Sequence, residues 1–219
     1  NQAIKWDLVP RNVASLASAP RTVKHEIKYL DPDQAKKFLV AVKGTPHEAL
    51  FTVAIAVGLR LGEALGLKWS DLNLHEGMLS VRRQCQRVNG KLTFTEPKTA
   101  KARRRVTLPD WLLPHLDQVT ADKRPEERIF TQSRQGLFSA VKRLCRAAGT
   151  PMTCPHGLRA TWASAAVTGG ATVEAVAATM GHSSTRVTLR HYVDRDAVVN
   201  AQVAAFDRLL NRSASVPQS

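Results

Sequence analysis

Apolar residues recur at steps of three and four over much of the chain, and this spacing predicts helices with one buried face. One helix is expected to begin at Asp31, with Pro32 in its first turn and Gln34 completing a capping box. A second, almost entirely apolar helix is expected between Pro46 and Gly58. Further helices are expected after Pro109 and over Gln135–Ala148, His156–Gly169, Val173–Met180 and Asp194–Arg212. Most of the chain is therefore expected to be helical.

Between Leu72 and Leu108 the pattern changes to a period of two, which is typical of strands. The pair Asn89–Gly90 lies between two such runs and is a strong signal for a two-residue hairpin turn. The predicted strands are Met78–Val88, Lys91–Thr95 and Arg105–Leu108. The expected fold class is mainly α with a small antiparallel β-sheet (α+β).

The charge balance favours a polyanionic partner. The chain has 219 residues, 43% of them hydrophobic, which is enough for a sizeable core. It carries 32 Lys and Arg against 18 Asp and Glu, a formal net charge of +14. Nucleic acid is favoured over a membrane, because no apolar run approaches the roughly 18 residues that a membrane-spanning helix needs.

The three cysteines argue against a fold held together by disulfides and against one held together by zinc. Cys85, Cys145 and Cys154 are odd in number, widely spaced and without a C-x-x-C pair, so neither a disulfide framework nor a thiolate zinc site is indicated. The reducing cytoplasm is the expected location. The chain begins with Asn–Gln and shows no signal-peptide pattern, so it is expected to be a fragment of a longer protein.

The stretch from Pro155 to Thr161 is the centre of the candidate chemistry. It places His156 and Arg159 three residues apart at the start of an apolar helix, where one ligand could reach both. Unpaired backbone N–H groups and a guanidinium fork at a helix N-terminus suit a phosphate. Taken alone, the same pair is better explained as a helix cap or a salt bridge, and only matching residues elsewhere in the chain favour a phosphate site.

Arg60 and Glu63 are a second pair, three residues apart in an otherwise apolar or glycine-containing segment. Glu63 could hold the Arg60 guanidinium in one orientation and leave part of it free, although a local helix ion pair is the simpler alternative. Lys98 lies in the basic turn 97–105, which is either a solvated loop or a hairpin tip that delivers a lysine into a groove.

Six residues come in an order and in local contexts that resemble the tyrosine recombinases, the phage integrase family. They are Arg60 in Gly-Leu-Arg-Leu-Gly-Glu-Ala-Leu, Lys98 in Pro-Lys-Thr, His156 and Arg159 in His-Gly-Leu-Arg-Ala-Thr, His182 in Gly-His-Ser-Ser, and Tyr192 ten residues after His182. The resemblance covers residues 30 to 212. One departure is Ala160, where many relatives have a second histidine.

The resemblance implies a catalytic domain and a role for each residue. Tyr192 would attack a DNA phosphate, leaving a 3′-phosphotyrosine and a free 5′-hydroxyl. Arg60 and Arg159 would hold the non-bridging oxygens, His156 and His182 would donate hydrogen bonds, Lys98 would protonate the 5′-oxygen, and Glu63 would support Arg60. Neither a metal nor a cofactor is expected, because two arginines can stabilise the charge of the transition state and the sequence lacks clustered carboxylates and a Walker loop.

The same resemblance organises the rest of the chain. Residues 1–24 are expected to be a linker or the end of a missing N-terminal core-binding domain, residues 25–212 the catalytic domain, and residues 213–219 a disordered tail. The expected partners are double-stranded DNA, three further copies in a tetramer on DNA, and accessory DNA-bending proteins. The free protein is expected to be a cytoplasmic monomer, encoded by a bacterial host or by a phage. The cations expected to contact DNA are Lys101, Arg103, Arg104, Arg134, Lys142 and Arg143.

The expected function is site-specific DNA recombination, for integration or excision of a mobile element. Two alternatives remain at this level: relaxation of DNA like a type IB topoisomerase, and DNA binding without catalysis. The intact set of six residues argues against the second alternative. The sequence leaves open the DNA target, the direction of the reaction, and delivery of the tyrosine in cis or in trans.

Overall fold

The computed structural model of the chain describes residues 2–18, 28–96, 103–120, 123–182, 184–186 and 188. Several predictions fall outside these described residues. They concern Lys98, Lys101, Tyr192, the helix Asp194–Arg212 and the tail 213–219.

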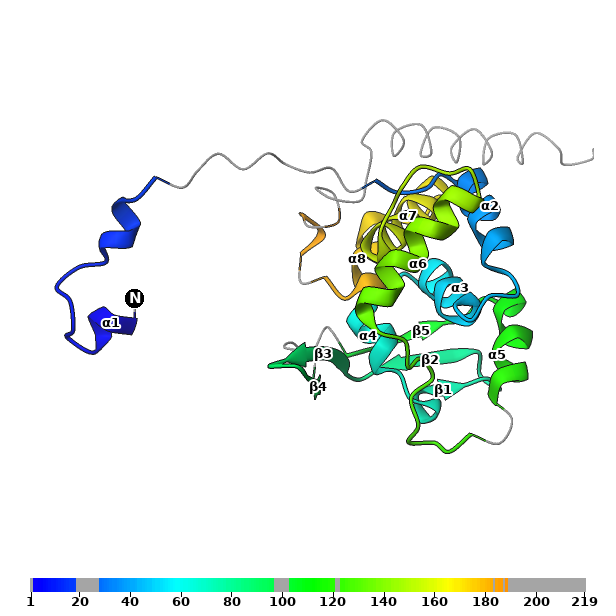
Figure 1. Ribbon diagram of the computed structural model, residues 1–219, viewed down its shortest axis with the longest axis horizontal. Helices are drawn as coiled ribbons and strands as arrows, with labels where there is room; N and C mark the ends of the chain where they lie inside the picture. The colour runs from blue at the N-terminus through cyan, green and yellow to red at the C-terminus, as the bar shows by residue number, and fades with distance from the viewer. Residues whose placement is uncertain are drawn as a thin grey trace, which may run out of the picture.

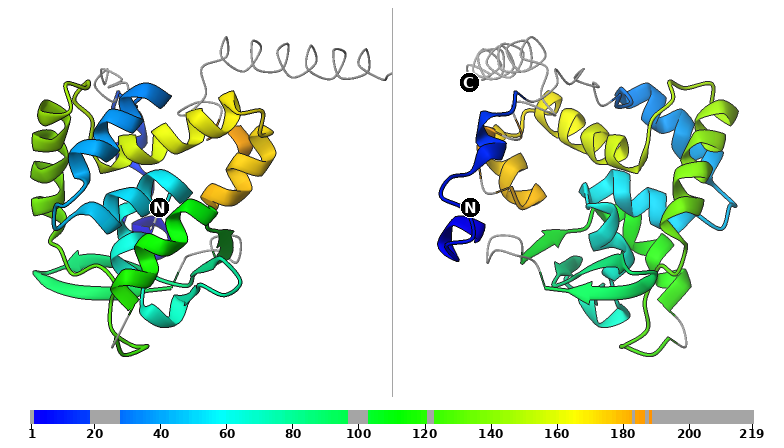
Figure 2. Two further views of the ribbon diagram at one scale, coloured as in Figure 1. Left: turned by 90° about the vertical axis from the view of Figure 1, so that its right-hand side faces the viewer. Right: turned by 60° about the vertical axis from the view of Figure 1, so that its left-hand side comes forward.

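The main body has a helical layer on one side and small antiparallel sheets on the other (Figures 1 and 2). The helices are α2 (Pro32–Val42), α3 (Glu48–Val57), α4 (Leu61–Gly66), α5 (Leu113–Thr120), α6 (Arg134–Ala147), α7 (Pro155–Thr168) and α8 (Val173–Met180). Short 3-10 turns are η2 (Trp69–Asp71) and η4 (Asp110–Leu112). In the helical layer α3 packs against α2 and α7, and α6 also contacts α2 and α7.

The helix boundaries follow the local signals of the sequence. The Asp31 side chain accepts a hydrogen bond from the Gln34 backbone N–H at 2.8 Å, and the Gln34 side chain accepts one from the Asp31 backbone at 3.1 Å, so the capping box is confirmed. Helix α3 ends at Gly58, whose φ of +61° is a left-handed conformation that favours glycine. Helix α8 has the boundaries that the sequence predicts.

Two antiparallel sheets form instead of one continuous run. Strands β1 (Leu72–Asn73), β2 (Met78–Val81) and β5 (Arg104–Thr107) make a three-stranded sheet in the order β1-β2-β5. Strands β3 (Gln84–Val88) and β4 (Lys91–Thr95) make a hairpin. Asn89 and Gly90 both have positive φ, as a type I′ turn requires, and the predicted hairpin is confirmed.

The predicted single strand Met78–Val88 is wrong, because the chain leaves the first sheet at Arg82 and Arg83. The Arg83 guanidinium forms an ion pair with Asp71 and donates to the Gly66 carbonyl at 3.4 Å. These contacts turn the chain towards α4, against which β3 then packs. A pattern of period two cannot distinguish one long strand from two strands joined by such a turn.

The core lies between the helical layer and the sheets. Phe38 of α2 and Phe51 of α3 meet edge to face with ring centroids 5.9 Å apart. Leu79 and Val81 of β2 and Leu158 of α7 are fully buried in the same cluster. This core fixes the start of α4 and the first turns of α7 relative to one another.

Residues 2–18 contain a short helix, α1 (Gln2–Lys5), and a 3-10 turn, η1 (Val13–Leu16). No described side chain of this segment is buried, and its large apolar side chains are mostly exposed. The division of the chain at residue 24 stays a prediction. In the part of the chain that the structure describes, every helix is too short or too polar to cross a bilayer.

Candidate active site

The candidate site begins where α3 ends and α4 starts. Gly58 terminates α3, and the chain then extends through Arg60, which lies just before the first residue of α4. Glu63, in the first turn of α4, accepts a hydrogen bond from the Arg60 backbone N–H at 2.9 Å. The sequence Gly-Leu-Arg-Leu-Gly-Glu thus brings a cation and a carboxylate together at a helix N-terminus, where a negative charge is stabilised.

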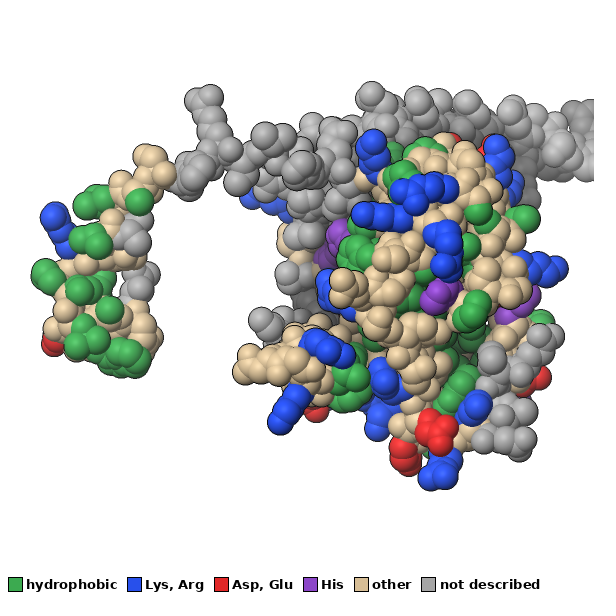
Figure 3. All heavy atoms as spheres, viewed as in Figure 1, with side chains coloured by type: hydrophobic (Ala, Val, Ile, Leu, Met, Phe, Trp, Pro, Cys, Tyr) green, Lys and Arg blue, Asp and Glu red, His purple; other side chains and the backbone are tan. Residues whose placement is uncertain are grey.

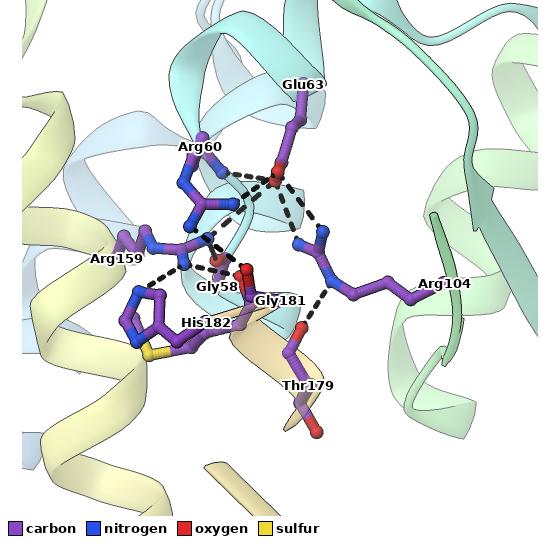
Figure 4. Close-up of polar contacts among 9 residues, drawn as sticks. Gly58, Arg60, Glu63, Arg104, Arg159, Thr179, Gly181 and His182 are labelled. Carbon is purple, nitrogen blue, oxygen red and sulfur yellow. Dashed lines mark hydrogen bonds and ion pairs between the residues drawn. The ribbon is translucent and has the colours of Figure 1, made fainter. Parts of the chain in front are cut away.

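The Glu63 carboxylate is the centre of a cluster of arginines (Figure 4). Its Oε1 accepts from Arg60 Nη1 at 2.8 Å and from Arg104 Nη1 at 3.1 Å, and its Oε2 accepts from Arg104 Nη2 at 2.9 Å. Arg159 Nη1 lies 3.7 Å from Oε2. Three guanidinium charges around one carboxylate leave a surplus of two positive charges, which suits an anionic ligand.

Arg159 reaches this cluster from the first turns of α7 and is fully buried, with a relative exposure of 0%. Its Nη1 donates to the Gly58 carbonyl at 2.7 Å, and its Nη2 donates to the Met180 carbonyl at 2.7 Å. Both carbonyls belong to helix C-termini, where positive charge is favoured. Arg159 therefore joins the ends of α3 and α8 to α7.

His182 follows the C-terminus of α8 and contacts Arg159. Arg159 Nη2 lies 3.0 Å from His182 Nε2, and a guanidinium can only donate, so Nε2 accepts and carries no proton. The ring proton is therefore on Nδ1, which donates to Thr188 Oγ1 at 2.8 Å. Burial, followed by the positive charges of the three nearby arginines, lowers the pKa of His182 to about 4. His182 is neutral at physiological pH.

The Glu63 carboxylate is ionised in this setting. Burial raises the pKa of the Glu63 carboxyl, but the hydrogen bonds and charge of Arg104, together with the charge of Arg159, outweigh this effect. The net result is a pKa below the usual value. A buried carboxylate that is ionised and fully paired can hold several cations in fixed positions.

Arg104 is the residue that the sequence analysis placed wrongly. The sequence predicts that it lies in the basic turn 97–105 and contacts DNA. Instead it lies in β5 with its side chain 7% exposed, and it contacts Glu63 and the Thr179 carbonyl. Alternation along the strand could have indicated this, because Arg104 shares a face with the apolar residues Val106 and Leu108.

The structure brings together four of the sequence-predicted site residues: Arg60, Glu63, Arg159 and His182. His156 lies one turn before Arg159 on α7 but is exposed to solvent. That both reach one ligand therefore stays a prediction. Among the described residues, no group of three His, Cys, Asp or Glu side chains gathers that could hold a metal ion.

The other expected DNA-contacting cations that the structure describes are at the surface. Arg103 is exposed and forms an ion pair with Glu96. Arg134, Lys142 and Arg143 are exposed on α6, with the Arg134 guanidinium over the Phe138 ring at 5.8 Å. In Figure 3 the Lys and Arg side chains are spread over both the helical part and the lower part of this face, and most visible acidic side chains lie near its lower edge.

The model of the phage integrase family matches residues 28–198. A XerC-like tyrosine recombinase of Caldanaerobacter subterraneus subsp. tengcongensis is 29% identical over 199 residues, which cover 78% of this chain and 51% of the relative. The integrase of Mycobacterium phage L5 is 26% identical over 228 residues, which cover 97% of this chain and 60% of that integrase. The chain thus spans only about half to three-fifths of the length of these relatives.

Solved structures show the same fold. The integrase of the transposon Tn1549, in complex with circular intermediate DNA, has a TM-score of 0.68 at 21% identity, covering 91% of this chain and 71% of that one. The XerA recombinase has a TM-score of 0.66 at 22% identity, covering 86% and 67%. The expected fold class, mainly α with a small antiparallel β-sheet, is confirmed, with the strands divided between two small sheets. The chain belongs to the phage integrase family.

Proposed function

We propose that the chain is the DNA-cleaving and rejoining part of a site-specific recombinase, which integrates or excises a mobile element. The observation that carries this proposal is the cluster of Arg60, Arg104 and Arg159 around Glu63, with neutral His182 beside it. Membership of the phage integrase family and the likeness of the fold to a DNA-bound integrase support it. No observation favours topoisomerase-like relaxation or binding without catalysis.

The reaction is a transesterification without a cofactor. The Tyr192 hydroxyl loses its proton to solvent and its oxygen attacks the scissile phosphorus. The bond to the 5′-oxygen breaks, and Lys98 gives that oxygen a proton. The product is a 3′-phosphotyrosine and a free 5′-hydroxyl, and the reverse attack by a 5′-hydroxyl rejoins DNA and releases Tyr192. The ester link keeps the energy of the broken bond, so that rejoining requires no nucleotide.

Within the arginine cluster, Arg60 is the residue that contacts the phosphate directly. Its side chain is 38% exposed, whereas the side chains of Arg104 and Arg159 are 7% and 0% exposed. Negative charge grows on the non-bridging oxygens during the attack, so a guanidinium held in place stabilises the transition state more than the ground state. Glu63 provides that fixed position for Arg60.

In this proposal Arg159 and His182 support the site without contacting the phosphate as long as they contact each other. The positive charge of Arg159 raises the potential at the site, because a buried charge is only weakly screened. For Arg159 or His182 to donate directly to a phosphate oxygen, their mutual contact at 3.0 Å must open. His156, on the exposed side of the same helix turn, is a further hydrogen-bond donor in this proposal.

Surface cations supply the affinity for double-stranded DNA in this proposal. Arg103, Arg134, Lys142 and Arg143, together with Lys101, contact phosphates and not base edges, so binding is sensitive to salt and weak in sequence preference. Arg104 is not included among these cations, because its side chain is only 7% exposed and three of its donors contact Glu63 and Thr179.

We further propose that four copies assemble on two DNA sites, aided by accessory DNA-bending proteins, and that the free protein is a cytoplasmic monomer. The apolar stripe Val199, Val203, Phe206 and Leu210 would dock on a neighbouring copy. Because the stripe follows Tyr192 in the chain, docking would make cleavage wait for assembly. Deletion of residues 195–219 should abolish synapsis and leave single-site binding intact. Loss of cooperative unfolding in the truncated chain would contradict trans docking.

A covalent-capture experiment tests the proposed function. A pool of nicked duplexes with a randomised core should trap protein–DNA adducts that survive denaturation, because the short fragment that carries the free 5′-hydroxyl diffuses away after cleavage. Tyr192→Phe removes the attacking oxygen and should bind the pool without forming an adduct. An adduct that persists in Tyr192→Phe would exclude this nucleophile, and the absence of any adduct with the unmodified chain would contradict the proposed function.

Lys98 has its own test on a substrate recovered from the pool. Lys98→Ala should cleave the normal phosphodiester slowly, and a 5′-bridging sulfur should restore its rate, because a thiolate leaves without a proton. The unmodified chain serves as the control on both substrates. If the sulfur fails to restore Lys98→Ala, Lys98 positions the phosphate and does not protonate the leaving group.

A further inference from the structure

Arg104 makes more contacts within the site than its place beside a basic turn suggests. Its guanidinium forms a two-pronged contact with Glu63, through Nη1 to Oε1 at 3.1 Å and through Nη2 to Oε2 at 2.9 Å. Its Nε donates to the Thr179 carbonyl in the last turn of α8. Three of its donors are thus directed at α4 and α8 (Figure 4).

These contacts separate Arg104 from the cations that face DNA. Its side chain is 7% exposed, and the carboxylate that it grips is 6% exposed. The neighbouring Arg105, which points to the other face of β5, has a side chain 60% exposed and pairs with exposed Glu76. Adjacent arginines on one strand therefore have opposite environments, which makes Arg105 a matched control for Arg104.

The same carboxylate also holds Arg60. Glu63 Oε1 accepts from both Arg60 Nη1 and Arg104 Nη1, so the two guanidinium groups share one oxygen. If Arg104 is removed, Glu63 loses both prongs of its strongest partner and can turn towards Arg159, whose Nη1 is already 3.7 Å from Oε2. The Arg60 guanidinium would then lose its fixed orientation.

We infer that Arg104 is a positioning residue for the transesterification: it locks the Glu63 carboxylate and, through Glu63, aims the Arg60 guanidinium at the scissile phosphate. This inference rests on the proposed function for the reaction that it serves. Arg104 touches neither the phosphate nor the leaving group. Residues that orient a reacting side chain in this way commonly change activity by about 10- to 100-fold when they are replaced.

The test compares Arg104→Lys, Arg104→Met and the control Arg105→Met. Single-turnover cleavage of a recovered substrate should be about 10- to 100-fold slower for both Arg104 variants, with an unchanged dissociation constant for DNA. Arg105→Met should cleave at the rate of the unmodified chain. Lysine keeps the charge and loses the fork, so Arg104→Lys is decisive if Arg104→Met does not fold.

A substrate with a methylphosphonate at the scissile position separates positioning from a general loss of structure. It carries one negative charge less, so the reaction depends less on Arg60. The defect of Arg104→Lys should therefore shrink on this substrate. An equal defect on both substrates would overturn the inference. So would a defect that only a 5′-bridging sulfur corrects, because Arg104 would then support Lys98 in protonating the leaving group.

A second readout needs no activity. In ¹⁵N spectra of arginine side chains, the Arg60 guanidinium of the unmodified chain and of Arg105→Met should rotate slowly about its Nε–Cζ bond, because Glu63 holds it. This restriction should disappear in Arg104→Lys. Its persistence would overturn the inference, even if the unmodified chain formed no Tyr192 adduct and the proposed function had failed.

Discussion

Replacing Glu63 with glutamine should destabilise the protein strongly, although the two side chains have almost the same shape. Glu63 is 4% exposed and accepts hydrogen bonds from Arg60 and Arg104, with Arg159 at 3.7 Å. Glutamine removes the negative charge and turns an –NH₂ group towards guanidinium donors. Breaking a buried ion pair at one partner costs about 3–5 kcal/mol, because the remaining charge is left unpaired.

The assays are equilibrium unfolding in urea, which gives the free energy of unfolding, and thermal unfolding, both at neutral pH and followed by circular dichroism. At roughly 2–4 °C per kcal/mol for a chain of this size, the melting temperature should fall by about 6–20 °C. The control is Glu76→Gln, which breaks the exposed pair with Arg105 and should cost no more than about 1 kcal/mol. If Glu63→Gln and Glu76→Gln lose the same small amount, Glu63 does not hold the cluster together.

Three further predictions concern stability and binding. The pKa of His182 is about 4 in the folded chain and near 6.5 in the unfolded chain, so the free energy of unfolding should decline as the pH falls from 6.5 towards 4. Urea titrations at each pH should show a weaker decline for His182→Gln. In thermal melts, Gly58→Ala should lower the melting temperature of the protein more than Gly149→Ala. Both glycines have φ near +60°, but a Cβ at Gly58 would lie 2.6 Å from Trp162, whereas a Cβ at Gly149 would have nothing within 4 Å. If about 6–10 phosphates are neutralised, fluorescence anisotropy with an unrelated duplex should show the affinity for DNA falling by roughly 10³–10⁵-fold between 50 and 200 mM salt. An affinity that does not change with salt would mean that the positive charges do not contact DNA phosphates.

Most helix boundaries and the hairpin turn could be predicted from local signals in the sequence. The capping box at Asp31, the left-handed Gly58 and the Asn89–Gly90 turn are each decided by neighbouring residues, so they could be predicted without tertiary structure. The break after Val81 could not, because it depends on Arg83 reaching Asp71 and Gly66 in another part of the chain. Contacts between distant segments leave no periodic pattern.

The site divides in the same way. Arg60 and Glu63 are three residues apart, and their contact could be predicted from helix geometry. Arg104 is 41 residues from Glu63, and its role depends on the strand register that places it opposite Val81. The tautomer of His182 follows from Arg159 and Thr188, which only the folded chain brings to its two ring nitrogens.

The most direct test of the proposed site is the effect of Arg60→Ala on cleavage and on binding, measured separately with one recovered substrate. If Arg60 stabilises charge that develops in the transition state, single-turnover cleavage should slow by about 10²–10³-fold, while the dissociation constant for the same DNA changes by less than about tenfold. Equal losses in rate and affinity, or an unchanged rate, would contradict the assignment of the Glu63 cluster as the site of phosphate chemistry.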